Sequence, residues 1–346
     1  MEHTKTVQSL REVADFQVSP GGRLFSADAG EIRQGWTTDI YFIKTREILR
    51  ATGLAETPVV AEVFAGRGGV LAGVPEVKNL LEGTGTEIWA LPEGESFGEK
   101  EVVMRLKGPY DSFGLYETAL LGILASSSGW ATAARKCKEA AGEKRVVCFG
   151  ARHIHPAVAP VMERAALVGG VDGASCILGA KLAGREPVGT VPHAVILIVG
   201  DTLEVARAYQ RLALPDSPVV VLVDTFKDEA EEALRVAAEL KERLHGVRLD
   251  TPNERGGVTP ALVREVRARL DQAGFPYVQI LVSGGLTPER IRSLKEAGAD
   301  AFGVGSYISA AAPIDMTMDI KEVNGRPVAK RGRIPGITPA PRLKKL

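Results

Sequence analysis

Short apolar runs alternate with longer amphipathic stretches from residue 145 onward. In the longer stretches apolar residues recur every three or four positions, as Ala230, Leu234 and Ala237 do, which is typical of helices with one buried face. The short runs predict strands at residues 146–149, 173–175, 190–193, 219–224, 247–250, 278–282 and 301–304. Strands that alternate with helices pair in parallel, and this set favours an irregular (β/α) barrel over residues 145–312. An open nucleotide-binding sheet would need a glycine fingerprint after its first strand, and the sequence has none there.

The segments before and after this barrel have a different pattern. Residues 1–108 combine many glycine turns with short strand candidates and a helix candidate at residues 39–52, which predicts an α+β domain with a mostly antiparallel sheet. Residues 109–144 are expected to form a helical connection. The Asn324-Gly325 turn lies between two strand-like stretches. Residues 313–346 are therefore expected to form a hairpin and a basic tail that return to the N-terminal domain.

Composition and charge exclude several classes of protein. Lys plus Arg and Asp plus Glu both number 43, so no net charge draws the chain to nucleic acid or to a membrane surface. The cysteines Cys137, Cys148 and Cys176 are far apart, which indicates reduced thiols and a cytoplasmic protein. Residues 1–10 are polar and no apolar run is long enough for a bilayer, so we expect neither a signal peptide nor a membrane span.

Glycine-rich turns end two consecutive predicted strands. One turn is Ser283-Gly284-Gly285 and the other is Gly303-Val304-Gly305-Ser306. Backbone N–H groups can approach an anion at such turns because no Cβ is in the way. The loops after the last two strands of barrels often bind phosphate. The alternative is that these glycines only make tight turns; because two successive strands carry them, we favour a phosphate site.

Polar side chains at the carboxyl ends of the other strands suggest the rest of a site. Arg152 follows the first strand, His193 ends the third and Asp224 ends the fourth. Arg248 and Asp250 lie two positions apart on the fifth strand, so both point to the same side. An Arg–Asp pair alone could be structural. Together with the glycine turns, these cationic and hydroxyl-binding groups suit a phosphorylated sugar.

Three further features have a simple structural explanation beside a functional one. His153 and His155 would share a face if extended and could bind a metal, but no carboxylate or cysteine lies close in sequence, so no metal site is predicted. Phe149 could be a core residue or could stack on a planar ligand. Asp39 precedes a predicted helix and could simply cap it.

A series of short stretches, taken in order, resembles the nicotinate phosphoribosyltransferases, in their compact archaeal-type branch within the type II phosphoribosyltransferases. The stretches are Thr38-Asp39-Ile40-Tyr41, Phe149-Gly150-Ala151-Arg152-His153, Gly169-Gly170-Val171-Asp172-Gly173-Ala174-Ser175, Gly189-Thr190-Val191-Pro192-His193-Ala194, Val223-Asp224-Thr225, Arg248-Leu249-Asp250-Thr251, Ser283-Gly284-Gly285-Leu286 and Gly303-Val304-Gly305-Ser306. The resemblance covers nearly the whole chain.

This resemblance implies a fold, a reaction and an assembly. The expected fold is an irregular (β/α) barrel with an N-terminal open-faced α+β sandwich domain. The expected reaction joins nicotinate to phosphoribosyl pyrophosphate, giving nicotinate mononucleotide and pyrophosphate, with Mg2+, with ATP as co-substrate and without zinc, because no cysteine follows Cys176. The expected assembly is a homodimer or higher homo-oligomer with shared active sites.

The resemblance also assigns roles to residues. His193 would be phosphorylated by ATP, and Arg248, Asp250 and Asp224 would complete the catalytic set. Nicotinate would be bound by Phe149, Arg152, Ser175, Asp39 and, from the partner chain, Tyr41. The phosphate site would comprise Ser283, Gly284, Gly285, Gly303, Gly305 and Ser306.

The choice of base depends on Ser175. A serine hydroxyl can donate to a carboxylate, which favours nicotinate over its amide. Quinolinate carries a second carboxylate and usually meets a more basic pocket than the sequence around Arg152 suggests. Two alternatives stay open: a decarboxylating quinolinate phosphoribosyltransferase, and a non-catalytic barrel that binds phosphoribosyl ligands. The presence of His193, Arg248, Asp250 and both glycine turns argues against the second alternative.

Overall fold

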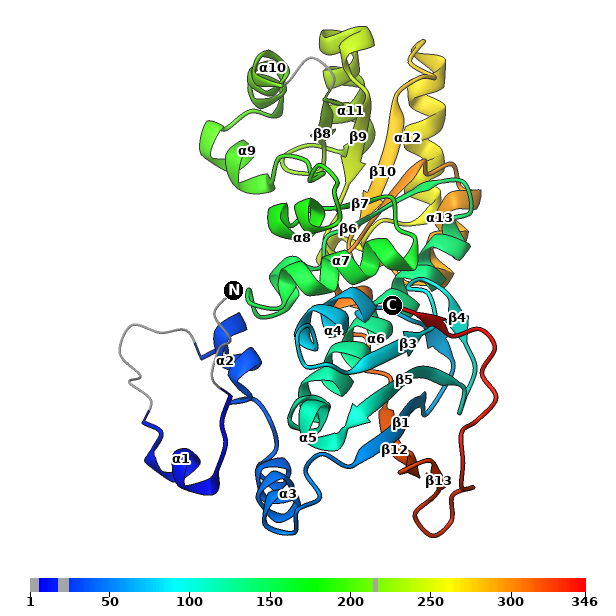
Figure 1. Ribbon diagram of the computed structural model, residues 1–346. Coiled ribbons are helices and arrows are strands. Elements are labelled where there is room, and N and C mark those ends of the chain that lie inside the picture. Colours follow the sequence, from blue (N-terminus) through cyan, green and yellow to red (C-terminus); the bar gives the residue numbers. More distant parts are fainter. Residues whose placement is uncertain (1–5, 18–24, 214–216) are drawn as a thin grey trace. The chain divides into compact units, whose positions relative to one another are not determined.

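The computed structural model describes residues 6–17, 25–213 and 217–346. The chain divides into two compact units, which are drawn in Figure 1. The N-terminal unit comprises Met1–Gly129 together with Ala312–Leu346, and the barrel unit comprises Trp130–Ala311. Within the described residues, no helix is both long and apolar enough to cross a membrane.

A parallel sheet forms the centre of the barrel unit. Its strands are β6 (Arg145–Cys148), β7 (Gly173–Ala174), β8 (Val220–Leu222), β9 (Gly246–Leu249), β10 (Gln279–Ser283) and β11 (Ala301–Val304), in the order β7-β6-β11-β10-β9-β8. Every pair in this order is parallel. The carboxyl ends of these strands therefore meet at one edge, and the loops that follow them lie close together.

Helices follow the strands, as the apolar periodicity predicts. They are α7 (Ala159–Gly169), α8 (Ile177–Leu182), α9 (His193–Val199), α10 (Thr202–Leu212), α11 (Glu229–Leu240), α12 (Pro260–Gln272), α13 (Pro288–Glu296) and α14 (Ser306–Ser309), with 3-10 turns η2 (Ala151–His153), η3 (Lys241–Arg243) and η4 (Asn253–Arg255). Thr259 and Thr287 cap α12 and α13, each of which begins with proline. The threonine hydroxyl accepts a hydrogen bond from a backbone N–H of the first turn, and proline has no N–H that would need a partner. Both residues therefore favour the start of a helix.

One predicted strand of the barrel is wrong. Residues 190–192 form no strand, and His193 begins α9 with Pro192 at the N-cap. Pro187 and Pro192 have no N–H to donate to a ladder, so the segment between them makes a single sheet-like bond, from Val188 N to Ala174 O at 2.9 Å. With the other predicted strands present, the expected fold class, a mixed α/β protein with an irregular parallel barrel, is confirmed.

An antiparallel sheet forms the centre of the N-terminal unit. Its strands are β1 (Pro58–Ala65), β3 (Glu87–Ala90), β5 (Val102–Pro109), β12 (Met316–Val323), β13 (Arg326–Pro327) and β14 (Lys344–Lys345), in the order β13-β12-β1-β5-β3-β14, and β2 (Gly69–Val70) pairs with β4 (Ser96–Phe97). The helices are α1 (Leu10–Asp15), α2 (Ala29–Gln34), α3 (Ile40–Ala51), α4 (Val74–Leu80), α5 (Tyr110–Phe113), η1 (Gly114–Tyr116) and α6 (Glu117–Ala141), the last of which continues into the barrel unit. Val63, Met104, Leu106 and Phe113 are fully buried in its core.

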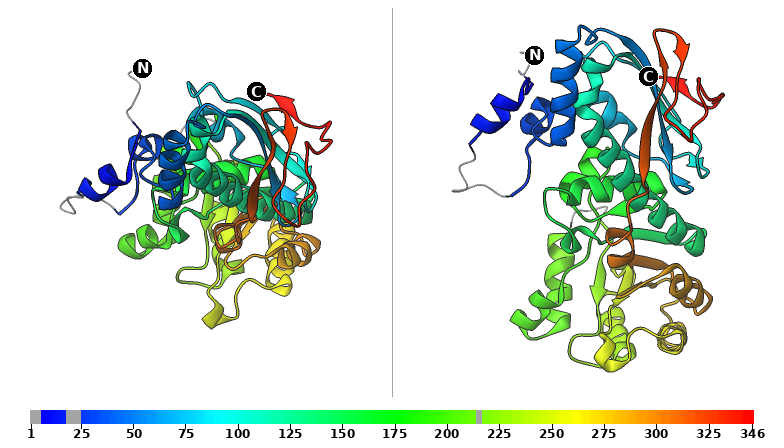
Figure 2. Two further views of the ribbon diagram at one scale, coloured as in Figure 1. Left: turned by 60° about the horizontal axis from the view of Figure 1, so that its bottom comes forward. Right: turned by 90° about the horizontal axis from the view of Figure 1, so that it is seen from below.

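The end of the chain packs on this antiparallel sheet (Figure 2). Asn324 and Gly325 have positive φ angles of 48° and 71°, which suit the two-residue turn between β12 and β13. The buried carboxylate of Glu62 on β1 accepts from Arg105 and from the backbone N–H of Thr338 in the tail. The tail therefore covers one face of the sheet before β14 joins its edge at β3.

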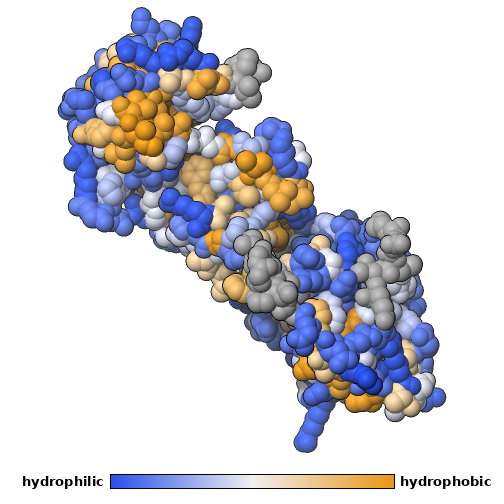
Figure 3. Space-filling model, turned by 90° about the vertical axis from the view of Figure 1, so that its left-hand side faces the viewer, coloured by the Kyte–Doolittle hydropathy of each residue, from blue (hydrophilic) through white to orange (hydrophobic). Residues whose placement is uncertain are grey.

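Large apolar side chains are exposed on α8 and α9 of the barrel unit. Ile177 and Leu182 on α8 are 70% and 58% exposed, and Ile198 on α9 is 84% exposed. Figure 3 shows apolar patches on the face of the molecule that it draws. Clustered exposed apolar side chains often mark a surface that binds another protein.

Candidate active site

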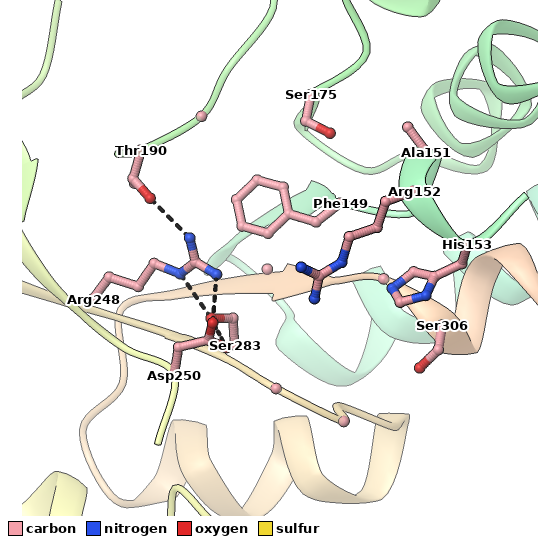
Figure 4. A pocket seen from close by; sticks show the side chains of 15 residues that line it. Phe149, Ala151, Arg152, His153, Ser175, Thr190, Arg248, Asp250, Ser283 and Ser306 are labelled. Atoms are coloured by element: carbon pink, nitrogen blue, oxygen red, sulfur yellow. Dashed lines mark hydrogen bonds and ion pairs between the residues drawn. The ribbon is translucent and has the colours of Figure 1, made fainter. Parts of the chain in front are cut away.

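A cavity of about 350 Å³ opens at the carboxyl ends of β6, β9, β10 and β11 (Figure 4). Its lining consists of Phe149, Ala151, Arg152, His153, Ser175, Gly189, Thr190, Arg248, Asp250, Ser283, Gly284, Gly285, Gly303, Gly305 and Ser306. These residues come from the ends of parallel strands and from the loops that follow them, which the sheet brings to one edge. The cavity thus joins both glycine turns with arginine, aspartate and aromatic side chains.

The Arg248 side chain is held by three hydrogen bonds in the cavity wall. Its guanidinium donates to Ser283 Oγ at 2.8 Å, to Thr190 Oγ1 at 2.9 Å and to Asp250 Oδ2 at 2.9 Å. Its Cζ atom also lies 5.2 Å from the centroid of the Phe149 ring. A planar guanidinium held by several partners has little freedom, so its charge stays fixed in the cavity wall.

Asp250 connects this arginine to the first glycine turn. Its Oδ1 accepts from Ser283 Oγ at 2.8 Å. A Cβ built on Gly284, whose φ is +92°, would lie 3.3 Å from the same oxygen. Gly284 and Gly285 both have positive φ angles, which other residues adopt only with strain. The turn therefore needs glycine for its backbone shape, and it leaves backbone groups open to the cavity.

The second glycine turn has a packing reason as well. A Cβ on Gly303 would come within 2.3 Å of the Phe149 ring, and one on Gly305 within 3.0 Å of His153 Nε2. Gly303 thus lets the aromatic ring lie flat against β11. Ser306 begins α14 directly after this turn. The alternative that the glycines serve packing holds for Gly303, and a Cβ on Gly284 would crowd Asp250, while one on Gly285 would meet nothing within 4 Å.

His193 and Asp224 lie beside the cavity but do not line it. His193 Nε2 is 3.1 Å from Asp224 Oδ1, and Asp224 Oδ2 accepts from the backbone N–H of Asp250 at 2.8 Å. The Asp224 side chain is 1% exposed. Burial raises the pKa of Asp224, and the Asp250 N–H and His193 partly offset that rise. Asp224 therefore holds both the backbone of Asp250 and the ring of His193.

Arg152 and His153 stand on the 3-10 turn η2 and face the cavity (Figure 4). Arg152 makes no hydrogen bond or ion pair with the part of the chain that the structure describes. An unpaired guanidinium in a cavity is free to bind an anionic ligand. His155, by contrast, accepts from Ala157 N at 3.2 Å and lies outside the cavity lining. Among the described residues, no group of three or more His, Cys, Asp or Glu is placed to hold a metal ion.

Ser175 also lines the cavity, but its hydroxyl is already used. Ser175 Oγ donates to Glu163 Oε1 at 3.0 Å. Glu163 is a fully buried residue of α7 that the sequence analysis did not single out. A serine has one hydroxyl proton, so Ser175 does not offer it to a ligand here.

Tyr41 and Asp39 belong to the N-terminal unit, at the start of α3. Tyr41 is 54% exposed. Asp39 occupies the N-cap of α3 without a side-chain cap bond, and its Oδ2 instead accepts from Thr118 Oγ1 at 2.8 Å. The assignment of Asp39 to the base site, and of Tyr41 to the base site of a partner chain, stays a prediction. The cavity residues that the sequence analysis did not assign to the site are Ala151, His153, Gly189 and Thr190.

Comparisons with known proteins agree on one family. Residues 39–128 match the family model described as quinolinate phosphoribosyl transferase, N-terminal domain, and residues 130–319 match the C-terminal domain of the same family. A solved structure of nicotinate-nucleotide pyrophosphorylase from Pyrococcus furiosus is 45% identical, with a TM-score of 0.86 over 90% of this chain and 81% of that chain.

Curated relatives carry two different names. Nicotinate phosphoribosyltransferase of Bacillus subtilis is 32% identical over 64% of this chain and 46% of its own length. Human nicotinate-nucleotide pyrophosphorylase [carboxylating] is 28% identical over 79% of this chain and 86% of its own length. The chain spans about half the length of the bacterial nicotinate phosphoribosyltransferases that it matches.

The expectation that the chain is a nicotinate phosphoribosyltransferase is wrong. Both family models that match are quinolinate phosphoribosyl transferase domains, and the 45% identical structure is a nicotinate-nucleotide pyrophosphorylase. Two physical premises of that expectation also fail. The Ser175 hydroxyl donates to Glu163, and Arg152 has a further basic side chain, His153, with it in the cavity lining besides the expected Arg248.

The type II phosphoribosyltransferase resemblance itself holds. The two matched domains cover most of the chain, and the parallel barrel and antiparallel sheet give the expected fold class. The chain therefore belongs to the quinolinate phosphoribosyl transferase family of type II phosphoribosyltransferases.

Proposed function

We propose that this protein is a quinolinate phosphoribosyltransferase, which forms nicotinate mononucleotide, pyrophosphate and carbon dioxide from quinolinate and phosphoribosyl pyrophosphate. The observation that carries the proposal is the cavity in which Arg152, Arg248 and His153 stand beside two glycine turns, with Arg152 free of any partner among the described residues. Quinolinate has two carboxylates, and phosphoribosyl pyrophosphate has phosphates at both ends. A cavity with two guanidinium groups, an imidazole and the bare backbone of two glycine turns suits both substrates.

The base would bind on the side formed by β6 and η2. Arg152 and His153 would face the two carboxylates, and the Phe149 ring would lie against the pyridine ring. A hydrogen bond to a charged group contributes about 1.5–3 kcal/mol. Quinolinate could make both contacts and nicotinate only one. The binding free energies of the two bases would then differ by about one such contribution, in favour of quinolinate.

The phosphoribosyl group would bind on the side formed by β9, β10 and β11. The Ser283-Gly284-Gly285 turn and the Gly303–Ser306 turn support a 5′-phosphate site, because their glycines line the cavity with backbone atoms alone. Asp250 would hold ribose hydroxyls. It is also the one carboxylate in the described cavity lining. Mg2+ is usually bound by substrate phosphates with one or two carboxylates, so this donor set fits a magnesium ion that would stabilise the charge of the pyrophosphate.

Bond formation would begin at the pyridine nitrogen. Its electron pair forms a bond to C1′ of the ribose while the bond from C1′ to the pyrophosphate oxygen breaks, and pyrophosphate leaves with that electron pair. Positive charge develops on the sugar and negative charge on the leaving group. Arg248, fixed by three hydrogen bonds, would stabilise the negative charge without having to reorient.

Decarboxylation would follow from the product of that step. The pyridine nitrogen is now cationic, so the bond between C2 and its carboxylate breaks and the electron pair stays at C2, next to the positive charge. Carbon dioxide leaves, and C2 takes up a proton. The positive charge on the adjacent ring nitrogen stabilises the electron pair at C2 until the proton arrives, so the step needs no additional electron acceptor.

ATP has no part in this reaction, because loss of carbon dioxide already makes it irreversible. The predicted use of ATP as co-substrate, with phosphorylation of His193, stays a separate prediction. Asp224, buried behind Asp250 and His193, would act by positioning Asp250. A homodimer with shared sites is also proposed, and the exposed apolar side chains of α8 and α9 support a protein-binding surface on the barrel unit.

The test is an incubation of the protein with phosphoribosyl pyrophosphate and Mg2+ and, in separate tubes, quinolinate, nicotinate or nicotinamide, each with and without ATP. The proposal predicts nicotinate mononucleotide from quinolinate alone, with or without ATP. Product from nicotinate but not from quinolinate would overturn it. Tight binding of phosphoribosyl pyrophosphate with no product in any tube would favour a binding protein instead.

A further inference from the structure

Glu163 is a buried residue outside the cavity lining that connects two loops of the cavity. It lies on α7 and is 0% exposed. Its Oε1 accepts from the backbone N–H of Ala151, at 3.2 Å, and from Ser175 Oγ, at 3.0 Å. Its Oε2 accepts from the backbone N–H of Cys176. One carboxylate thus ties the turn that carries Arg152 and His153 to the turn that carries Ser175.

The partners of Glu163 explain why a carboxylate stands at this position. All of them are donors, and an ionised carboxylate is an acceptor at both oxygens. A glutamine would place its NH2 group against one of the backbone N–H groups, so one buried donor would lose its partner. A buried donor left without a partner destabilises the arrangement to which it belongs. The surroundings leave little room to adjust, since a Cβ on Gly179 would lie 3.1 Å from the Glu163 Cβ.

We propose that Glu163 is a positioning residue that sets the base-binding side of the cavity by fixing the Arg152 turn against the Ser175 turn. This inference rests on the proposed function for its choice of substrate. Glu163 itself does not line the cavity, so it acts through the residues that do. The phosphoribosyl side is held by the separate network of Arg248, Asp250 and Ser283, to which Glu163 makes no hydrogen bond.

A second consequence concerns the polarity of Ser175. Because its proton is directed to Glu163, the hydroxyl presents only lone pairs to the cavity. Lone pairs repel a carboxylate, so the carboxylates of the base are directed to Arg152 and His153. Burial raises the pKa of Glu163, and the hydrogen bonds from Cys176, Ser175 and Ala151 lower it in part and so favour the ionised acceptor.

The test compares Glu163→Gln with a matched control, Glu232→Gln. Glu232 is also a buried carboxylate of the barrel unit, 1% exposed, but it pairs with Arg235 on the same helix, α11, away from the cavity lining. We expect E163Q to raise the KM for quinolinate at least tenfold while the KM for phosphoribosyl pyrophosphate changes less than twofold. E232Q should change neither KM. Equal increases in both KM values for E163Q would overturn the proposal.

Amide hydrogen exchange tests the same claim without activity. In E163Q, exchange should become faster in residues 149–155 and 173–178 and stay unchanged in residues 283–287. Unchanged exchange in the first two segments, or faster exchange throughout the barrel unit, would contradict a specific tether. If the wild type does not convert quinolinate, the proposed function fails, and this exchange measurement still decides whether Glu163 ties the two turns.

Two further variants keep the test informative if E163Q does not fold. Ser175→Ala removes one donor and keeps the two backbone bonds, so it should raise the KM for quinolinate by two- to fivefold and leave exchange in residues 149–155 unchanged. Glu163→Asp keeps an acceptor-only side chain and should restore part of the quinolinate affinity lost in E163Q. If Glu163→Asp had a KM for quinolinate as high as that of Glu163→Gln, the carboxylate of Glu163 would not be the group that positions the two turns.

Discussion

Arg248 Nη2 lies 2.9 Å from Asp250 Oδ2, with both side chains less than 20% exposed. The two residues lie at and just beyond the end of β9, two positions apart. The pair places a fixed positive charge and a hydroxyl acceptor side by side in the cavity wall. It is the part of the site on which charge stabilisation at the leaving pyrophosphate would depend.

Replacing Arg248 by lysine should therefore be costly, although the positive charge is kept. A lysine cannot donate to Ser283, Thr190 and Asp250 from one planar group. We expect kcat to fall about 100-fold, the cost that loss of one fixed donor to a developing charge typically brings. Steady-state kinetics with saturating substrates would measure this. A kcat within threefold of the wild type would mean that Arg248 does not act in the transition state.

Arg152 should behave differently, because it has no partner in the described part of the chain. Arg152→Ala should raise the KM for quinolinate about 10- to 100-fold, in keeping with loss of one charged hydrogen bond of about 1.5–3 kcal/mol. The melting temperature should not fall, since no buried partner is left unpaired. Arg264→Ala, at an exposed position of α12, is the control and should change neither quantity. An unchanged KM in R152A would remove Arg152 from the base site.

The first glycine turn can be tested with two glycines of similar backbone shape. Gly284 has φ +92° and faces Asp250, whereas Gly256 has φ +99°, and a Cβ added there would meet nothing within 4 Å. Alanine at either site should lower the free energy of unfolding by about 1–2 kcal/mol, the cost of the left-handed conformation. Only Gly284→Ala should also raise the KM for phosphoribosyl pyrophosphate. If Gly284→Ala and Gly256→Ala had the same KM for phosphoribosyl pyrophosphate, the Gly284 turn would not bind this substrate.

Most of the cavity can be predicted from sequence because its residues follow strands. Alternation along a strand places Arg248 and Asp250 on one side, and parallel pairing brings the turns after β10 and β11 together. These inferences need only local periodicity and the rule that parallel strands end at one edge. They are enough to place the glycine turns, Phe149 and Arg152 at the same edge of the sheet.

The remaining residues could not be predicted, for identifiable reasons. The sequence pattern places Thr190 in a strand because its β-branched neighbours outweigh two prolines that prevent a ladder. Glu163 resembles a surface residue of an amphipathic helix, and nothing local shows that its partners are donors on two other loops. The hydroxyl direction of Ser175 depends on Glu163 in turn, so the choice of base that rested on Ser175 was wrong.

Stability of the N-terminal unit should depend on pH through Glu117. Burial raises the pKa of Glu117 to about 7, and Asp319 adds to the rise while the Tyr110 hydroxyl, at 3.1 Å, and Lys330 oppose it. Between about pH 4.5 and 7 the folded protein keeps a proton that the unfolded chain has lost. The free energy of unfolding should therefore fall as pH rises through this range and level off above it.

Glu117→Gln removes this contribution while keeping an acceptor for Tyr110. Urea unfolding of the wild type and the variant at pH 5, 6, 7 and 8 provides the measurement. The difference in unfolding free energy, wild type minus variant, should decrease from pH 5 to 7 and level off toward pH 8. A difference that is the same at every pH would contradict a raised pKa for Glu117.

Carbon dioxide release from position-labelled quinolinate tests the proposed function most directly. The protein would be incubated with phosphoribosyl pyrophosphate, Mg2+ and quinolinate labelled with carbon-14 either in the 2-carboxylate or in the 3-carboxylate. The account predicts that the 2-carboxylate label leaves as carbon dioxide, one for each nicotinate mononucleotide formed, and that the 3-carboxylate label stays in the nucleotide. The proposal would be contradicted if nicotinate were converted while quinolinate gave neither carbon dioxide nor nucleotide.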